Sequence, residues 1–247
     1  MKAIQVNGDE LEWADFAAAD CTAGTVKIRV HATAINRADL LQRAGGYPPP
    51  PGASPIMGLE CAGEVIEIGE GVQRCRVGDH VCALLAGGGY AEEVIVPAGQ
   101  VLAVPKGLSL VQAAALPEVF ATAYLNLYME GALQNGEKVI VHAGASGVGT
   151  AAIQLLGQSE NPVFVTVGSD AKLKSCIGLG AAAGSVRHEG SFADAARQWA
   201  GDTGVDVILD PVGGQYLTDN LNLLGLCGRL VLIGLMGGAV TEVNLAL

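Results

Sequence analysis

The rhythm of apolar residues changes near residue 109, and this change constrains the possible folds more than any other feature of the chain. Before it, short runs alternate apolar and polar residues; within residues 25–35, Val26, Ile28 and Val30 alternate with charged side chains. A period of two is typical of a half-buried strand. After it, apolar strands alternate with helices, which indicates a parallel sheet covered on both faces. The sequence therefore predicts an α/β protein with two unlike parts.

The first part, residues 1–117, is predicted to be a β-rich domain that forms a partly open barrel. Glycine-rich turns separate further strands over residues 60–69, 79–85 and 90–97. One helix is expected over residues 37–44, because Asn36 followed three positions later by Asp39 is typical of an N-terminal cap.

The second part, residues 118–247, is predicted to be a doubly wound parallel sheet. Where the first part ends, Ser109 and Gln112 have the spacing of a capping box for a short helix, and Pro117 begins a longer helix that leads into the second part. Strands are expected over residues 138–143, 162–168, 205–210 and 228–235, and helices over residues 117–128, 147–156, 170–178 and 191–200.

Composition and charge exclude several classes of protein. Half of the 247 residues are hydrophobic and only 16% are charged, which excludes a disordered chain and a coiled coil. The net charge of −11 is spread over both parts, so we expect neither nucleic acid nor an anionic membrane as partner. Apolar runs are too short for a membrane helix and the start lacks a secretory signal, so a cytoplasmic location is expected. The six cysteines have no metal-binding spacing and are predicted to be buried thiols.

The most informative stretch runs from Val139 to Gly149, with the sequence VIVHAGASGVG. It leaves an apolar strand, turns tightly and enters a helix, which is the setting of a dinucleotide-binding fingerprint. Main-chain N–H groups at a helix start bind a pyrophosphate, and small residues let it approach. Ser146 replaces the middle glycine of the G-x-G-x-x-G pattern, so a turn that merely needs glycines is the alternative interpretation.

The end of the next strand favours a cofactor with a 2′-phosphate. An NAD site requires an acidic residue there, about 20 residues after the fingerprint, whereas this chain has Gly168 and Ser169, with Lys172 three residues further. A hydroxyl and a cation suit a phosphate. Asp170 leaves the alternative open, since it could repel a phosphate or bind the ribose itself, and Lys172 could be an ordinary solvated lysine.

Several stretches together resemble the medium-chain dehydrogenase/reductase superfamily, among them NRADLLQR, YPPPPGAS and HAGASGVGTAAIQL. Within that superfamily the chain is most similar to the zinc-free quinone oxidoreductases, in particular the tumour-suppressor-inducible branch. The resemblance implies a GroES-like β-rich domain followed by a Rossmann domain.

The resemblance also implies that no metal is bound. Zinc-dependent relatives have a cysteine at the position of Asn36 and a histidine at that of Leu59, and neither residue here is a zinc ligand. The four histidines occupy no ligand spacing and are predicted to be structural.

Site residues follow from the resemblance position by position. It implies that Asn36 and Tyr47 border the reacting ring and orient the acceptor, although Asn36 could be only a helix cap and Tyr47 only a loop aromatic. It implies NADPH as the cofactor, with a binding set of Asn36, Thr122, Ala145, Ser146, Gly147, Val148, Gly168, Ser169, Lys172, Arg187, Gly234, Leu235 and Met236. Arg187 stands where close relatives have a tyrosine, and could bind the phosphate or point into solvent.

The function implied is NADPH-dependent reduction of quinones or related conjugated carbonyls by direct hydride transfer without a metal. An enoyl or alkenal reductase on the same fold is the alternative within enzymes, and a non-catalytic NADPH-binding protein is the alternative outside them.

The length of 247 residues is short for this family. Five strands of the doubly wound order 3-2-1-4-5-6 can be assigned, so the sixth is expected to be missing and the sheet C-terminally incomplete. Relatives form homodimers, and an open edge at strand five makes that assembly doubtful here. If the chain is a fragment, we expect weakened activity with cofactor binding partly retained.

Overall fold

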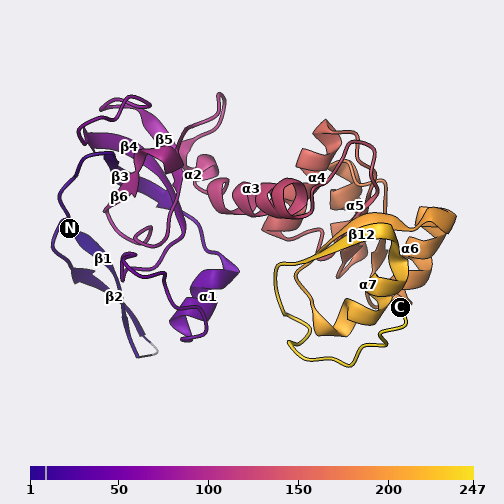
Figure 1. Cartoon of the computed structure of the whole chain (residues 1–247). Helices are drawn as coiled ribbons and strands as arrows, with labels where there is room; N and C mark the ends of the chain where they lie inside the picture. Colours follow the sequence, from indigo (N-terminus) through magenta and orange to yellow (C-terminus); the bar gives the residue numbers. More distant parts are fainter. Residues whose placement is uncertain (9) are drawn as a thin grey trace. The chain divides into compact units, whose positions relative to one another are not determined.

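The computed structural model describes residues 1–8 and 10–247 and contains two compact units, Met1–Glu118 and Val119–Leu247 (Figure 1). The chain passes from unit 1 to unit 2 through helix α3 (Pro117–Tyr124). Each hydrophobic core cluster in the described part of the chain has all its residues within one unit. The two units are therefore described separately.

Unit 1 is built on an open, five-stranded antiparallel sheet in the order β6-β3-β4-β5-β7. Its strands are β3 (Thr25–Thr33), β4 (Glu60–Ile68), β5 (His80–Leu84), β6 (Glu93–Pro97) and β7 (Val101–Ala103). As the alternation predicted, Val26 and Ile28 of β3 are fully buried and pack against apolar residues of the other four strands. The two edge strands are not paired with each other, which agrees with the predicted partly open, β-rich domain.

The smaller elements of unit 1 are a hairpin and two short helices, namely β1 (Lys2–Asn7), β2 (Glu10–Asp15), α1 (Arg37–Arg43) and α2 (Leu110–Ala113). Both predicted caps form. The Asp39 carboxylate accepts the N–H of Asn36 at 2.7 Å, and Gln112 accepts the N–H of Ser109 at 2.9 Å. The hairpin was not expected, because almost every side chain of β2 is exposed and the strand therefore lacks an apolar alternation.

Unit 2 is built on a parallel sheet in the order β10-β9-β8-β11-β12. Its strands are β8 (Val139–Val141), β9 (Val163–Val167), β10 (Ala183–Val186), β11 (Val205–Asp210) and β12 (Leu224–Leu232). Numbered along the chain within this unit, the order is 3-2-1-4-5, as in a doubly wound nucleotide-binding sheet. Ligands of such sheets bind outside the carboxyl ends of the strands, where the order reverses.

Helices cover both faces of this sheet. They are α4 (Gly147–Gln158), α5 (Asp170–Gly178), α6 (Phe192–Ala200) and α7 (Leu217–Leu223). Val139 and Val141 of β8 belong to a core cluster that includes α4 and α5, whereas Ile140 between them belongs to the cluster with α6 and α7. Successive residues of a strand point to opposite faces, so α4 and α5 lie on one face and α6 and α7 on the other.

Two predicted element boundaries in unit 2 were wrong. The helix that begins at Pro117 ends at Tyr124 and continues as a π-helix, η2 (Leu125–Glu130), in which the N–H of Gly131 bonds to the carbonyl of Asn126. The strand predicted over residues 228–235 is β12, which begins at Leu224 and ends at Leu232. It ends there because its neighbour β11 is followed by Pro211, which has no N–H to continue the ladder.

Short 3-10 turns complete both units. They are η1 (Ala98–Gln100) in unit 1, and η3 (Gly201–Thr203) and η4 (Gly214–Tyr216) in unit 2. The sequence analysis counted five strands for this sheet but gave residue ranges for four, so neither strand β10 nor helix α7 was located. β10 is four residues with only Val186 fully buried, so its apolar pattern is too short to detect.

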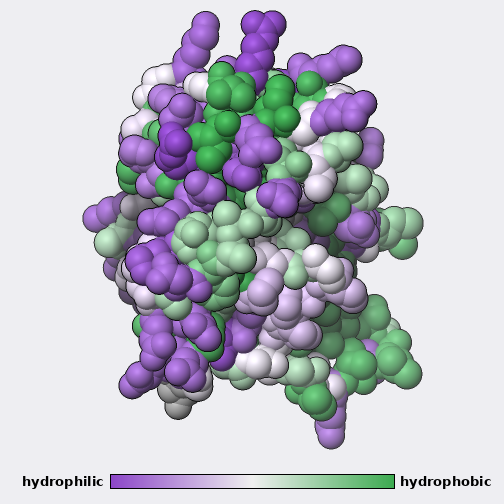
Figure 2. Space-filling view, turned by 90° about the vertical axis from the view of Figure 1, so that its left-hand side faces the viewer, coloured by the Kyte–Doolittle hydropathy of each residue, from purple (hydrophilic) through white to green (hydrophobic). Residues whose placement is uncertain are grey.

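The face of the molecule in Figure 2 is mixed in character. Hydrophilic side chains project from much of the face in Figure 2, and apolar residues form patches between them. Among the residues described, no helix has both the length and the apolar character needed to cross a bilayer. All six cysteines are free thiols and four of them are buried, as predicted for most of the set. Burial raises the pKa of the Cys61 thiol to about 12.

Candidate functional site

The glycine-rich segment lies at the carboxyl end of β8, the central strand of the parallel sheet. A β-carbon on Gly144 would lie 2.7 Å from Cβ of Val165, and one on Gly149 would lie 2.5 Å from the carbonyl oxygen of Gly144. Both positions therefore require glycine so that the loop can pack on β9 and α4 can begin directly above the loop. The glycines serve a close approach of backbone segments, which is one of the roles they have in a dinucleotide fingerprint.

Main-chain N–H groups are available at the start of α4. Ser146 caps the helix, and its hydroxyl accepts the N–H of Gly149 at 3.1 Å. The N–H groups of Ala145, Gly147 and Val148 form no hydrogen bond within the part of the chain that the structure describes. They lie at the positive end of a twelve-residue helix, so this terminus is suited to an anion such as a pyrophosphate. All four residues predicted to bind it are gathered here.

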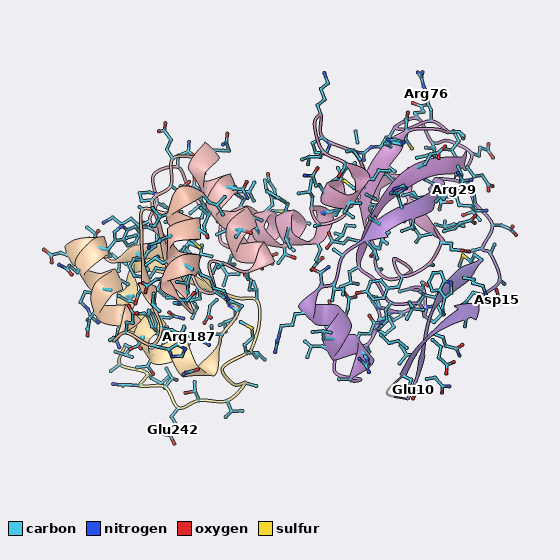
Figure 3. The ribbon with its side chains drawn as sticks, turned by 180° about the vertical axis from the view of Figure 1, so that it is seen from behind. Glu10, Asp15, Arg29, Arg76, Arg187 and Glu242 are labelled. Carbon is cyan, nitrogen blue, oxygen red and sulfur yellow. The ribbon has the colours of Figure 1, made fainter. Side chains whose placement is uncertain are left out.

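The predicted 2′-phosphate residues converge at the ends of β9 and β10. Gly168 and Ser169 follow β9, Ser169 caps α5, and Lys172 stands in the first turn of that helix. The N–H of Arg187 bonds to the carbonyl of Val167 at 2.9 Å. The Nε atom of Arg187 lies 3.9 Å from the position that a β-carbon on Gly168 would take. The Arg187 side chain is labelled in Figure 3.

The ends of β9 and β10 form one corner of the sheet, and the side chains there carry charges of both signs. Arg187 and Lys172 are exposed, and the Arg187 Nε atom donates to His188 at 3.0 Å. Asp170 stands in the same first turn of α5 as Lys172. The corner thus offers two cations and one carboxylate to a ribose or its phosphate.

The third predicted group, Gly234, Leu235 and Met236, follows β12 and runs beside the loop after β11. The N–H of Met236 bonds to the carbonyl of Pro211 at 3.1 Å, and a β-carbon on Gly234 would lie 2.8 Å from that same oxygen. Leu235 and Met236 are about half exposed, at 57% and 46%. They supply accessible apolar surface at the carboxyl edge of the sheet.

Thr122 lies on α3, within unit 2. Val119, three residues earlier on that helix, packs against the fingerprint, because a β-carbon on Gly147 would lie 2.8 Å from its Cγ1 atom. Residues three apart share one side of a helix, so Thr122 lies on the side of α3 that carries this contact. The carbonyl of Thr122 also accepts the side-chain amide of Asn126 at 2.8 Å.

In unit 1, Asn36 is held by buried carboxylates. Its side-chain NH₂ donates to Glu60 at 2.8 Å, and its main-chain N–H donates to Asp39. The second oxygen of Glu60 accepts the N–H of Glu118 at 3.0 Å. Glu60 is 1% exposed, and burial raises the pKa of its carboxyl while the two N–H donors oppose that shift. The Asn36 side chain also accepts the main-chain N–H of Asp39 in the capping box, so one NH₂ hydrogen is left without a partner among the described residues.

Tyr47 lies on the loop after α1 and is 46% exposed. No direct hydrogen bond between Tyr47 and Asn36 is found among the described residues, and their joint role stays a prediction.

Whether the site could hold zinc can be tested on the side chains of Asn36 and Leu59. The NH₂ group of Asn36 is a donor engaged with Glu60, and Leu59 is aliphatic and 8% exposed. In residues 1–8 and 10–247, His, Cys, Asp and Glu side chains nowhere form a group of three that could hold a metal ion. The side chains at Asn36 and Leu59 therefore do not fit zinc, whose protein ligands are thiolate, imidazole or carboxylate groups.

Sequence reasoning missed a polar cluster inside unit 2. His142, Thr166, Asn220 and Asp210 are buried and hydrogen-bonded to one another. His142 directly follows the apolar strand β8, and Thr166 lies within the apolar strand β9. A polar residue in such a position is the sequence signal that could have indicated the cluster. His142 is buried and hydrogen-bonded, as expected of a structural histidine, whereas His31, His80 and His188 are exposed.

A doubly wound sheet with a glycine-rich loop, followed by a helix whose first N–H groups include several without partners among the described residues, is typical of dinucleotide-binding proteins of the α/β class. Family models agree with this arrangement: residues 22–106 match the alcohol dehydrogenase GroES-like domain, and residues 147–247 match the zinc-binding dehydrogenase domain. The chain belongs to the medium-chain dehydrogenase/reductase superfamily.

Solved structures and curated relatives give the same result. The quinone oxidoreductase of Escherichia coli in complex with NADPH is 31% identical, with a TM-score of 0.84 over 99% of this chain and 76% of that one. The CurK enoyl reductase is 31% identical, with a TM-score of 0.86 over 96% of this chain and 74% of that one. The human synaptic vesicle membrane protein VAT-1 homolog is 36% identical over 86% of this chain and 54% of its own length. The chain thus spans about half the length of this curated relative.

Proposed function

We propose that this protein is an NADPH-dependent reductase of quinones or related conjugated carbonyls that works without a metal. The observation that carries the proposal is the start of α4, where the N–H groups of Ala145, Gly147 and Val148 have no partner among the described residues and close packing requires glycine at positions 144 and 149. The likeness to an NADPH-bound quinone oxidoreductase supports it. The free thiols suit a reducing compartment and support a cytoplasmic location as part of the proposal.

Each group of residues has a role in the proposal. Ala145, Ser146, Gly147 and Val148 bind the pyrophosphate, whereas Gly168, Ser169, Lys172 and Arg187 surround the 2′-phosphate. Thr122, Gly234, Leu235 and Met236 border the nicotinamide. When bound, NADPH supplies a hydride to the acceptor, and the protein supplies binding, orientation and electrostatics.

Asn36 and Tyr47 orient the acceptor in this proposal. The Asn36 amide is held in place by Glu60, so its remaining N–H can donate to an acceptor oxygen without paying for reorientation. The Tyr47 hydroxyl is an accessible second donor. The acceptor's proton comes from solvent or from the ribose, so no side chain is assigned as a general acid.

The test follows the absorbance of the reduced cofactor. The purified chain is mixed with NADPH and either a naphthoquinone, an ortho-quinone or a 2-alkenal. We expect quinone-dependent oxidation, and a Tyr47→Phe variant with turnover lower by about tenfold and an unchanged Kd for NADPH. Tyr128→Phe, which removes a hydroxyl bonded to Ser159 in unit 2, is the matched control.

Each of the other outcomes rejects a part of the proposal. Faster reduction of the alkenal than of any quinone would establish the enoyl or alkenal reductase, an alternative that the likeness to CurK favours. Tight NADPH binding without oxidation by any acceptor would leave a non-catalytic binding protein.

A further inference from the structure

Four polar side chains are buried where the carboxyl ends of β8, β9 and β11 meet helix α7. The exposed fractions of Thr166, His142, Asn220 and Asp210 are 3%, 1%, 0% and 0%. Burying a polar group is costly unless it is hydrogen-bonded. Every one of these side chains has partners, and none of them has a role in the hydride transfer proposed above.

The direction of every hydrogen bond in this group follows from Asp210. Its carboxylate accepts the N–H of Val212 at 2.6 Å and that of Gly213 at 3.2 Å. A carboxylate oxygen also faces Asn220 at 3.0 Å, and Asn220 must therefore present its NH₂ there. The carbonyl oxygen of the same amide then faces Nε2 of His142 at 2.7 Å, so Nε2 must carry the ring proton.

The opposite end of the chain of bonds is then determined as well. With the proton on Nε2, Nδ1 of His142 is an acceptor, and the hydroxyl of Thr166 donates to it at 3.0 Å. The oxygen of that hydroxyl in turn accepts the N–H of Ala143 at 3.3 Å. The bonds thus run in one direction from Ala143 through three side chains to Asp210.

Each end of this series of hydrogen bonds holds a loop in place. Ala143 has a φ of 52°, a left-handed conformation that is unfavourable for a residue with a β-carbon, and its carbonyl accepts the N–H of Ser146 at 2.8 Å. At the far end Asp210 fixes Val212, whose carbonyl accepts the N–H of Gly237 at 2.7 Å. One end therefore sets the start of the glycine-rich loop, and the other sets the segment that follows β12.

Aromatic rings close the space around the imidazole. The ring of Phe192 lies 5.0 Å from that of His142, and the ring of Tyr216 lies 4.8 Å from it. Burial lowers the pKa of His142, which keeps the ring neutral and the direction of the bonds unchanged.

We infer that Thr166, His142, Asn220 and Asp210 are positioning residues that hold the glycine-rich loop and the segment after β12 in the relative arrangement that binds the dinucleotide. The inference rests on the proposed NADPH site. It assigns no chemistry to the imidazole, which acts only as the middle of a directed chain of hydrogen bonds.

Substitution of Thr166 tests this inference. Thr166→Val keeps the shape of the side chain but removes both hydroxyl bonds, and Thr166→Ser keeps them. We expect the Kd of NADPH to rise about tenfold in Thr166→Val and to stay near the wild-type value in Thr166→Ser. Ser159→Ala is the control, because it removes hydrogen bonds to Tyr128 and Asn161 at the opposite end of β9 and should lower the melting temperature without changing the Kd.

The possible results separate the two proposals. A wild-type Kd in Thr166→Val, with a lowered melting temperature, would show that the cluster is only structural and overturn the inference. Failure of the wild-type protein to bind NADPH would overturn the proposed function, and the positioning role would fall with it.

A measurement on the wild-type chain tests the bond direction without relying on a folded variant. Nitrogen-15 spectra of the histidine side chains distinguish a protonated Nε2 from a protonated Nδ1. Variants His31→Gln, His80→Gln and His188→Gln identify the other three rings by loss of their signals. We expect His142 to be neutral with the proton on Nε2, and a proton on Nδ1 would overturn the inference.

Discussion

Lys172 and Arg187 approach the end of β9 from different elements, one from the first turn of α5 and one from the residue after β10. Their side chains are exposed, so each is free to meet a charged ligand at low desolvation cost. The carboxylate of Asp170 in the same turn opposes them. In our proposal, the preference for NADPH over NADH therefore depends on the opposing charges of Lys172, Arg187 and Asp170. It can be tested by changing one of these side chains.

Reversing the charge of Lys172 should weaken NADPH selectively. We expect Lys172→Glu to raise the Kd of NADPH by about tenfold or more, because a charge-assisted contact is replaced by repulsion, and to change the Kd of NADH little. Lys174→Glu is the matched control, since it makes the same charge change at another exposed position of α5. Equal weakening of both cofactors, or equal effects of the two substitutions, would contradict a contact with the 2′-phosphate. The measurement is fluorescence titration with each reduced cofactor.

At the scale of elements, β12 is an edge strand that is held by more than its pairing with β11. The guanidinium of Arg229 forms a two-pronged ion pair with Glu137, and its Nε donates to the carbonyl of Gly131 at 2.8 Å. The ion pair lowers the pKa of Glu137. One side chain thus ties the edge strand to the loop between η2 and β8.

Replacing this arginine by lysine tests the contribution of the two-pronged geometry. Lysine cannot make two parallel bonds to one carboxylate, so we expect Arg229→Lys to lower the free energy of unfolding by about 1–2 kcal/mol in urea titrations. Arg197→Lys, in the exposed pair with Asp194, should change it by less than about 0.5 kcal/mol. Similar losses of unfolding free energy in the two variants would show that the two-pronged geometry at Arg229 adds no stability beyond that of an exposed ion pair.

At the scale of the whole molecule, the two units have separate hydrophobic cores. Each unit contains one of the two tryptophans. Trp13 lies on β2 in unit 1, and Trp199 lies on α6 in unit 2, where its ring is 5.6 Å from that of Phe164. The residues that we propose for nucleotide binding at the carboxyl edge of the parallel sheet belong to unit 2. A nucleotide that binds only the folded state should therefore stabilise the unit that holds it.

Two variants with a single tryptophan, Trp13→Phe and Trp199→Phe, make this measurable by fluorescence during thermal unfolding. The oxidised cofactor NADP⁺ at about 100 times its Kd adds about 2.7 kcal/mol. We expect it to raise the Trp199 midpoint by about 5–10 °C and to leave the Trp13 midpoint nearly unchanged. A shift confined to Trp13 would contradict the assignment of the nucleotide site to unit 2, and equal shifts would show that the units unfold together.

Much of the fold was predictable because the signals that produce it are local. The alternation in β3, the cap at Ser109 and the glycine pattern around Gly144 each depend on residues a few positions apart. The short elements β1, β2 and β10 were not predictable, since they bury too few side chains to leave a pattern. The candidate site follows the same division: the start of α4 was predicted from its own residues, whereas the bond from Asn36 to Glu60 was not.

The sequence by itself determined the two-part organisation, the positions of most helices and strands, and the loop that is suited to a pyrophosphate. Only the tertiary structure decided which buried polar groups meet. Thr166, His142, Asn220 and Asp210 come from four elements, and their hydrogen bonds exist because the strand order places β8 between β9 and β11 with α7 packed above them. The physical reason is that periodicity and capping act over one or two helical turns, whereas the partner of a buried polar atom depends on how distant segments pack.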